Sequence, residues 1–421
     1  MLKRLVGAPF LFLVASACVS HGLIAGELAV DRREIESARA ALSQALASRS
    51  PDEIGTATVT WRLLNEDLPP ERAEETVPFP DSEAGISESE AQALARALWR
   101  RIEDYAWWER PNHEPQPLRV PATFIDAALN AAEITQDRRM LDRAIRAGDY
   151  LLSVQTRLGG VFGFPVPRSR LERAENQAAL RFLERARAGG IRLQDIVREN
   201  WIVEDLGDGG LNFDNGLAGE SLFALYEATG EQRFLAGARR AADWALTRPL
   251  VVNYNYNGFS AALLARAFAV TGERHYLDEA VERAILGVVS GQFKHGPQTG
   301  SWIDPHNRRH VYRYVMIRQL AIVYDVVPED HPEKAAIGEA LQAAVWAVER
   351  EMRLLGGLTT GDAGQAAYCV LARVGTASMA ERDPDITHAV YRLMANGARR
   401  ADLRAPAGVM CFLTLAPHLR W

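Results

Sequence analysis

The sequence predicts an all-α protein built from repeated helical hairpins that form one continuous body. The main observation is a unit of two helices and a short turn, at residues 212–246, which recurs 42 residues later. The matched positions are Asn215-Gly216 with Asn257-Gly258, Thr229-Gly230-Glu231 with Thr271-Gly272-Glu273, and Leu235, Ala238 and Ala242 with Leu277, Ala280 and Ala284. Periods of about 20–50 residues indicate repeat architectures, because one unit cannot bury its apolar face alone. No stretch alternates convincingly with period two, so we expect few strands.

The two helices of the unit differ in where their apolar residues lie. The first is apolar on all sides, with Leu222 and Phe223 near its middle, which is typical of a buried helix. The second is amphipathic, with Phe234 on one side and Arg240 on another. Gly230 stands between them and can adopt the left-handed conformation that ends a helix. Each unit is therefore expected to contribute one inner and one outer helix.

The first 17 residues have the order of an export signal. Lys3 and Arg4 form a basic start, residues 5–14 an apolar core, and residues 15–17 a cleavage site of small side chains. We expect a signal peptide over residues 1–17 and a protein that is periplasmic or secreted. Cys18 gives a second interpretation, a lipoprotein attached to the membrane through its acylated cysteine. An uncleaved N-terminal anchor is a third.

The rest of the chain divides into an arm and one large domain. Residues 18–86 form an N-terminal arm or linker, with a helix over residues 34–47 and then prolines among acidic residues. Residues 87–421 form the helical domain, and Ser87, with Glu90 three places later, is a capping signal for its first helix. The expected helices cover residues 87–105, 121–134 with 137–154, 174–188 as an insertion, 212–246, 253–286, 312–326 with 332–355, 362–374 with 386–395, and 406–415. Cys369 and Cys411 lie in apolar helical contexts and are interpreted as buried free thiols, with a disulfide between them in an oxidising compartment as the alternative.

The repeated hairpins resemble a known fold. Inner helices of the pattern GLxxxSLxxLYExTG, followed by outer helices of the pattern RFLxxAxxAxxW, are similar to the (α/α)6 toroid of the six-hairpin glycoside hydrolases and related polysaccharide lyases. The stretch 149–155, followed by Gly159-Gly160, also resembles toroid-type pectate lyases and terpene-cyclase-like barrels. The resemblance covers roughly residues 90–420 and rests mostly on packing residues, so it implies a fold and names no subfamily.

In such a toroid, the loops that enter the inner helices line one end of the central cavity. The loop 295–313 carries the strongest functional signal, because it holds three of the nine histidines, a tryptophan, an aspartate and three arginines. Aromatic faces stack on sugar rings, and arginine pairs bidentately with uronate carboxylates. Asn215 and Asn257 precede the repeated glycines and are interpreted either as helix caps or as residues that line the cavity.

These loops provide the candidate site residues. The catalytic candidates are Tyr256, His306, Asp214 and Asp304. The candidates for substrate binding are Asn215, Asn257, Tyr254, Trp302, Arg308, His310, Arg313 and Trp107. The side chains of His295, Asp304, His306 and His310 could ligate a metal. Their spacing matches no strong template, so we expect no cofactor and no metal.

Two reaction classes fit these residues, and a binding role is the third interpretation. In β-elimination on a uronic acid, Tyr256 or His306 transfers the proton while Arg313 neutralises the carboxylate. In glycoside hydrolysis, two carboxylates among Asp208, Asp214, Glu220, Asp304 and Asp362 act as acid and base. The sequence slightly favours a lyase for an acidic polysaccharide or oligosaccharide over a hydrolase, and a non-catalytic glycan-binding toroid is the alternative to both. The formal net charge of −6, without a basic cluster, argues against a nucleic-acid partner.

Overall fold

The computed structural model describes residues 32–66, 68, 75–79, 87–167 and 174–360 of the chain. The expected helices over residues 362–374, 386–395 and 406–415 lie outside these residues, as do Cys369, Cys411, the signal segment 1–17 and Cys18. The described part is mainly helical and contains two small sheets.

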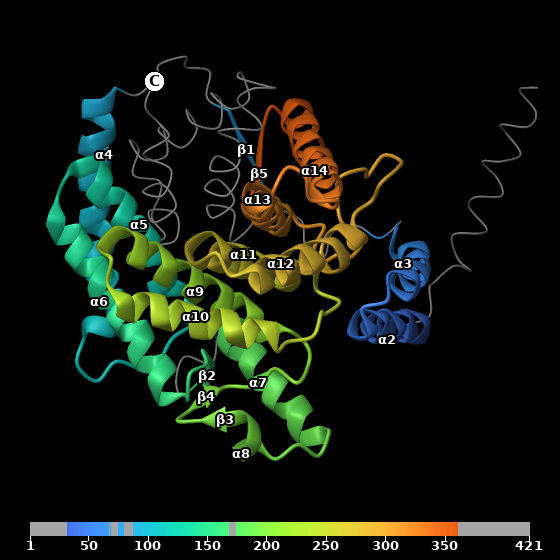
Figure 1. Ribbon diagram of the computed structural model, residues 1–421, viewed down its shortest axis with the longest axis horizontal. Helices are drawn as coiled ribbons and strands as arrows, with labels where there is room; N and C mark the ends of the chain where they lie inside the picture. Colours follow the sequence, from blue (N-terminus) through green and yellow to red (C-terminus); the bar gives the residue numbers. More distant parts are fainter. Residues whose placement is uncertain (1–31, 67, 69–74, 80–86, 168–173, 361–421) are drawn as a thin grey trace, which may run out of the picture.

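Within the described residues, four helical hairpins pack together as one body (Figure 1). Their inner helices are α5 (Arg119–Thr135), α9 (Gly210–Thr229), α11 (Tyr254–Thr271) and α13 (His310–Val326). Their outer helices are α6 (Arg138–Arg157), α10 (Gln232–Leu246), α12 (Arg274–Gly287) and α14 (Lys334–Leu355). Each inner helix packs on its own outer helix and on the next inner helix, so the inner helices form a continuous row. Helix α4 (Glu88–Ile102) packs on α5, in the place of an outer helix that precedes the first inner one.

The repeated glycines are required by the close packing of this row. A Cβ atom at Gly216 in α9 would lie 2.9 Å from the Cβ of Phe259 in α11. A Cβ atom at the equivalent Gly258 in α11 would lie 1.9 Å from Oε1 of Gln319 in α13. Gly230 and Gly272 end their helices with φ of +72° and +73°, the left-handed region that favours glycine. The sequence repeat is therefore a repeat of helix contacts and helix ends.

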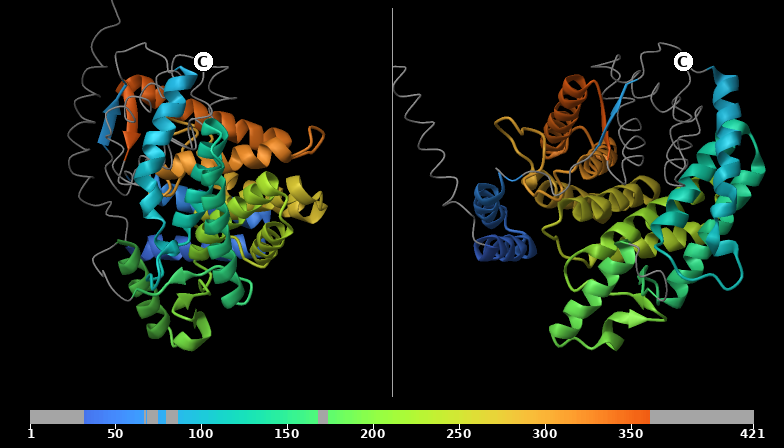
Figure 2. Two further views of the ribbon diagram at one scale, coloured as in Figure 1. Left: turned by 90° about the vertical axis from the view of Figure 1, so that its left-hand side faces the viewer. Right: turned by 180° about the vertical axis from the view of Figure 1, so that it is seen from behind.

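An insertion between α6 and α9 covers one end of the inner helices. It contains β2 (Phe164–Pro165), α7 (Ala174–Ala188), α8 (Leu193–Ile196), β3 (Val197–Arg198) and β4 (Trp201–Ile202). The strands form an antiparallel sheet in the order β2-β4-β3. Figures 1 and 2 show these elements gathered together at the lower end of the molecule.

The N-terminal arm is more regular than the sequence predicts. The expected helix is α2 (Arg32–Ser48), but a second helix, α3 (Pro51–Asn65), follows it and forms a hairpin with it. Arg49, between the two helices, pairs with Glu279 and Glu282 of α12 at 2.7 Å and 3.0 Å. Further along, β1 (Glu75–Pro78) pairs antiparallel with β5 (Gly357–Thr360). Ser50 caps α3, and a proline stands at the first position of the helix. Both are helix-start signals, but the acidic and β-branched residues of this stretch made them hard to recognise in the sequence.

Short 3-10 turns complete the description: η1 (Glu103–Tyr105), η2 (Trp107–Glu109) and η3 (Val289–Gly291). Among the described residues, no helix is both long enough and apolar enough to cross a membrane.

Candidate functional site

A cavity of about 390 Å³ lies where the inner helices begin. Four of its residues stand in the first turns of the four inner helices: Arg119 of α5, Phe213 of α9, Tyr256 of α11 and Tyr312 of α13. The inserted elements close it from the other side through Phe164, Ile202 and one face of α7. This is the end of the toroid at which the sequence analysis places the site, and we call it the central cavity.

Arg119 is held rigidly at the wall of the central cavity. Its guanidinium lies 4.4 Å from the ring centroid of Phe213 and 5.6 Å from that of Phe164. Asp214, only 1% exposed, accepts a hydrogen bond from the Arg119 backbone N–H at 3.1 Å and another from its guanidinium at 3.4 Å. Nε of Arg119 has no hydrogen-bond partner among the described residues. A planar cation fixed in this way is suited to an incoming carboxylate.

Two further carboxyl groups line the central cavity, in the turn before α9. Asp205 is 3% exposed; its Oδ1 accepts from the Gly207 backbone N–H at 3.0 Å, while its Oδ2 has no partner among the described residues. Burial raises the pKa of Asp205, because the charged form loses its solvation. Asp208 pairs with Arg185 of α7 at 3.4 Å and accepts from the Gly210 backbone N–H. Desolvation also raises the pKa of Asp208.

Tyr256 belongs to the same group of side chains. Burial raises the pKa of its phenol to about 12, and the charges of Asp208 and Asp214 add to the increase while Arg119 opposes it. Tyr256 lines the same cavity as Tyr312, Arg119 and Asp208. At neutral pH its phenol stays protonated, so it can donate a proton but is a poor base.

His306 and Asp304 are not among the residues that line the central cavity. The ring of His306 stacks on that of Tyr312, with centroids 4.4 Å apart. Asp304 accepts a hydrogen bond from Asn307 Nδ2 at 2.5 Å, and its other oxygen lies 3.4 Å from the His306 backbone nitrogen. His306 thus contacts Tyr312, which lines the central cavity, but is not itself one of the cavity residues.

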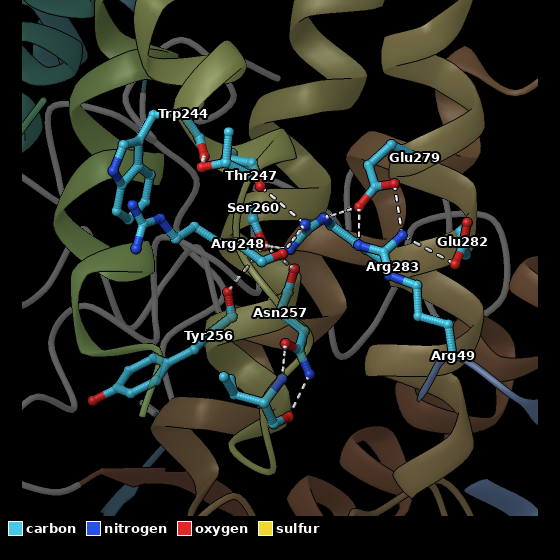
Figure 3. A network of polar contacts seen from close by, with 12 residues as sticks. Arg49, Trp244, Thr247, Arg248, Tyr256, Asn257, Ser260, Glu279, Glu282 and Arg283 are labelled. Carbon is cyan, nitrogen blue, oxygen red and sulfur yellow. Dashed lines mark hydrogen bonds and ion pairs between the residues drawn. The ribbon is translucent and has the colours of Figure 1, made fainter. Parts of the chain in front are cut away.

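Asn257 follows Tyr256 directly but points in another direction (Figure 3). It is fully buried, and its amide bonds the backbone N–H and C=O of Val251 and the C=O of Gly287. Asn215 similarly donates to the Ala241 C=O at 3.0 Å. The N-cap positions of α9 and α11 are occupied by Gly209 and Asn253, neither of which forms a side-chain capping hydrogen bond. The two repeated asparagines therefore join each inner helix to neighbouring backbone, a role that is neither helix capping nor an open place on the cavity wall.

Three of the expected binding residues are placed around a second pocket, of about 520 Å³, beside α14. His310 and Arg313 both bond Glu351 of α14, at 2.6 Å and 2.7 Å. Arg308 donates to the backbone C=O groups of Trp302, Ile303, Asn65 and Leu68, which ties the N-terminal arm to this loop. The structure therefore does not bring Arg313 together with Tyr256.

The remaining aromatic candidates are packed inside the protein. Trp302 is fully buried and its indole N–H donates to the Val288 C=O at 3.0 Å. Tyr254 is fully buried with its ring against Gly291, where a Cβ atom would lie 2.3 Å from the ring. Trp107 packs edge-on against Trp108 and Tyr150. Within the described part of the chain, no three His, Cys, Asp or Glu side chains are grouped to hold a metal, and His295 is exposed.

Arg119, Asp205 and the α7 residues of the central cavity are not among the residues predicted from the sequence. Asp205 stands in the run EDLGDGG, where three acidic residues and glycines precede a buried helix, and this turn signal could have identified it. Nothing in the local sequence marks Arg119, because its role depends on Phe213 and Asp214, which lie far away along the chain.

Comparisons with known proteins agree on the fold. No protein-family model matches the sequence, and no curated protein matches it. Among solved structures, a glycosyl hydrolase family 88 protein from Bacteroides vulgatus matches at 11% identity, over 77% of this chain and 97% of that one, with a TM-score of 0.50. A family 76 glycoside hydrolase from a bovine Bacteroides thetaiotaomicron strain matches at 12% identity, over 79% of each chain, with a TM-score of 0.51.

An unsaturated glucuronyl hydrolase from Streptococcus agalactiae, with bound dGlcA-GalNAc6S, matches at 14% identity, over 83% of this chain and 98% of that one, with a TM-score of 0.49. At such low identities these matches concern the fold alone. The family 88 and family 76 structures confirm the fold predicted from the repeats: the chain has the (α/α)6-toroid fold.

Proposed function

We propose that the protein is a carbohydrate-active enzyme that cleaves a uronate-containing polysaccharide or oligosaccharide in the central cavity, by hydrolysis. The observation that carries this proposal is Asp205, a buried carboxyl with a raised pKa and an unpartnered oxygen on the cavity wall. A carboxyl in such a place retains its proton to higher pH, as a general acid must. The matched glycoside hydrolases of the same fold support an enzyme that acts on sugars.

The other groups of the central cavity fit the rest of the reaction. Asp205 would protonate the glycosidic oxygen as the bond to the leaving sugar breaks. Asp208 would serve as the second carboxylate, which activates water or stabilises the positive charge on the sugar ring, while Asp214 would hold Arg119 in place. Arg119 would bind the uronate carboxylate, in the role that the sequence analysis gave to Arg313. Tyr256, Tyr312 and Phe213 offer faces and hydroxyls for the sugar ring.

β-Elimination by Tyr256 is the second candidate. The position of Tyr256 near Arg119 supports it, since the base must lie beside the neutralised carboxylate. A pKa of about 12 argues against Tyr256 as that base at neutral pH. This reverses the slight preference for a lyase that the sequence alone gives.

The test is incubation of the purified protein with a panel of neutral and acidic glycans. Hydrolysis gives new reducing ends without the far-ultraviolet absorbance of an unsaturated uronate, whereas elimination gives both. We expect the first result, on acidic glycans only. Asp205→Asn should abolish the signal and Asp195→Asn, an exposed carboxylate of α8, should not. Retention of glycans without any turnover would instead indicate the binding-protein alternative.

We also propose export, from the basic, apolar and small-residue order of residues 1–17. N-terminal sequencing of the native protein should find a start at or near Cys18. An intact Met1 in a cytoplasmic fraction would contradict it.

A further inference from the structure

Helix α7 presents one face to the central cavity. Ala178, Phe182 and Arg185 recur at helical spacing, with Ala179 and Arg181 beside them, and all five line the cavity. Residues three and four apart share a face of a helix. Arg187 is exposed, as Arg181 and Arg185 are, but it is not among the cavity residues. The cavity face of α7 thus carries one aromatic ring and two guanidinium groups.

The two arginines differ in what they contact. Arg185 reaches across to Asp208, with 3.4 Å between NH2 and Oδ2. Among the described residues, Arg181 forms no ion pair, although it too lines the cavity. Arg185 can exchange this partner for another anion, because the pair is long and the Arg185 side chain is 70% exposed. Within the described part of the chain, the cavity face therefore holds one cation without an acidic partner and one with an exchangeable partner.

Arg119 provides a separate cationic anchor on another element. It is fixed by Phe213 and Asp214 at the start of α5, so it does not belong to the α7 face. The cavity volume of about 390 Å³ falls within the range of roughly 300–1,000 Å³ that is common for ligand sites. A ligand with a single acid group would engage one anchor and leave the other with water.

We propose that α7 is a specificity element: Arg181 and Arg185 bind a second acidic group of the substrate, so that the central cavity selects oligosaccharides with acids on neighbouring sugars. The proposal rests on the proposed function, since it takes the ligand to be an acidic glycan. Guanidinium–carboxylate hydrogen bonds are charge-assisted and bidentate, which gives the discrimination between one acid group and two. The arginines of α7 act in binding, and the reacting bond lies at the carboxyl groups of the α9 side.

The experiment is calorimetric titration with galacturonate, digalacturonate and the monomethyl ester of digalacturonate. Wild-type protein should bind digalacturonate about tenfold more tightly than the monoester, a difference of about 1.4 kcal/mol. In Arg181→Ala and in the Arg181→Ala/Arg185→Ala double variant this difference should shrink or vanish, with galacturonate affinity unchanged. Arg187→Ala, on the same helix but off the cavity face, should behave as wild type. Increasing salt should reduce the preference, because exposed charges are screened.

The outcomes separate this inference from the proposed function. Equal binding of the diacid and its monoester by wild type, or an equal effect of Arg187→Ala, would overturn the role of α7 alone. If the preference for the diacid depends on α7 but no glycan is turned over, the role of α7 in binding is supported and the catalytic proposal is overturned. If wild type binds none of the three probes, both fail. Where turnover is observed, the α7 variants should raise KM for diacid substrates and leave kcat within about twofold.

Discussion

Two buried polar clusters among the described residues differ in whether their polar atoms have hydrogen-bond partners. The first, which we call the Arg283 cluster, lies between α11 and α12 (Figure 3). Arg283 is fully buried and donates to Glu279 at 2.7 Å, to Ser260 at 3.3 Å, and to the C=O groups of Ala245 and Arg248 at 2.9 Å and 2.5 Å. The second cluster is the central cavity, where Asp205 Oδ2 and Arg119 Nε have no partner among the described residues.

This difference distinguishes a structural cluster from a binding cluster. A buried polar atom without a partner costs about 1–3 kcal/mol unless a water molecule or a ligand satisfies it. The Arg283 cluster satisfies its own donors and, through Glu279, fixes Arg49 of the N-terminal arm. The central cavity leaves polar atoms that a ligand can satisfy. Tyr256 and Asn257 are neighbours in the sequence but belong to different surroundings. Tyr256 lines the central cavity, whereas Asn257 bonds the backbone of Val251 and Gly287.

The largest expected effect is loss of turnover in Asp205→Asn. The amide cannot donate the catalytic proton as an acid, so turnover should fall by roughly 10²–10⁴. Stability should change in the opposite sense. Because the folded pKa of Asp205 is raised, deprotonation destabilises the folded protein as the pH rises above about 4. Urea unfolding at two pH values should show that the Asp205→Asn variant gains stability relative to wild type at neutral pH and not near pH 3.

The second prediction concerns the Arg283 cluster. Arg283→Met should lower the free energy of unfolding by about 3 kcal/mol, because two buried C=O groups and Glu279 lose their donor. Arg274→Met, in the same helix, removes an exposed pair with Asp278 and should cost less than about 1 kcal/mol. Any folded Arg283 variant should keep the wild-type kcat. A selective loss of kcat without loss of stability would contradict the structural assignment of this cluster.

The helices were predictable because helix ends and close helix contacts require glycine at particular positions, which can be recognised in the sequence. Gly230 and Gly272 take left-handed conformations, and Gly216 and Gly258 permit close helix contacts, so the repeat is visible in the sequence. The site was less predictable because it depends on which way each side chain turns. Arg313 stands in the expected first turn of α13 but is drawn outward by Glu351, 38 residues later. The inserted α7 adds a wall to the cavity that no hairpin pattern locates.

The third prediction tests the boundary between neighbours. Asn257→Ala removes three buried hydrogen bonds and should lower the free energy of unfolding by about 2 kcal/mol, with turnover of the folded protein unchanged. Tyr256→Phe removes only a hydroxyl and should change stability by less than about 0.5 kcal/mol. If Asp205 is the acid, Tyr256→Phe should reduce turnover less than about tenfold. A loss of roughly 10²–10⁴ would instead assign proton transfer to Tyr256 and revive elimination.

The smallest effect on turnover is expected at Glu351, and this residue shows whether His310 and Arg313 form a structural clamp or a second binding cluster. Burial alone would raise the pKa of Glu351, but the hydrogen bonds and charges of His310 and Arg313 outweigh it and lower the pKa to about 2. A carboxyl with a lowered folded pKa stabilises the protein above its unfolded pKa, here 4.5, and loses that contribution as the pH falls toward 2.

Glu351→Gln should therefore lower the free energy of unfolding by on the order of 1–3 kcal/mol at neutral pH, and by progressively less below about pH 4. The measurement is urea unfolding across this range, with Glu339→Gln, an exposed residue of the same helix, as the control. Glycan turnover should be unchanged, because the pair lies in the pocket beside α14 and not in the central cavity. A pH-independent stability difference would contradict the clamp. A rise in KM for acidic glycans would show that Arg313 contributes to substrate binding after all.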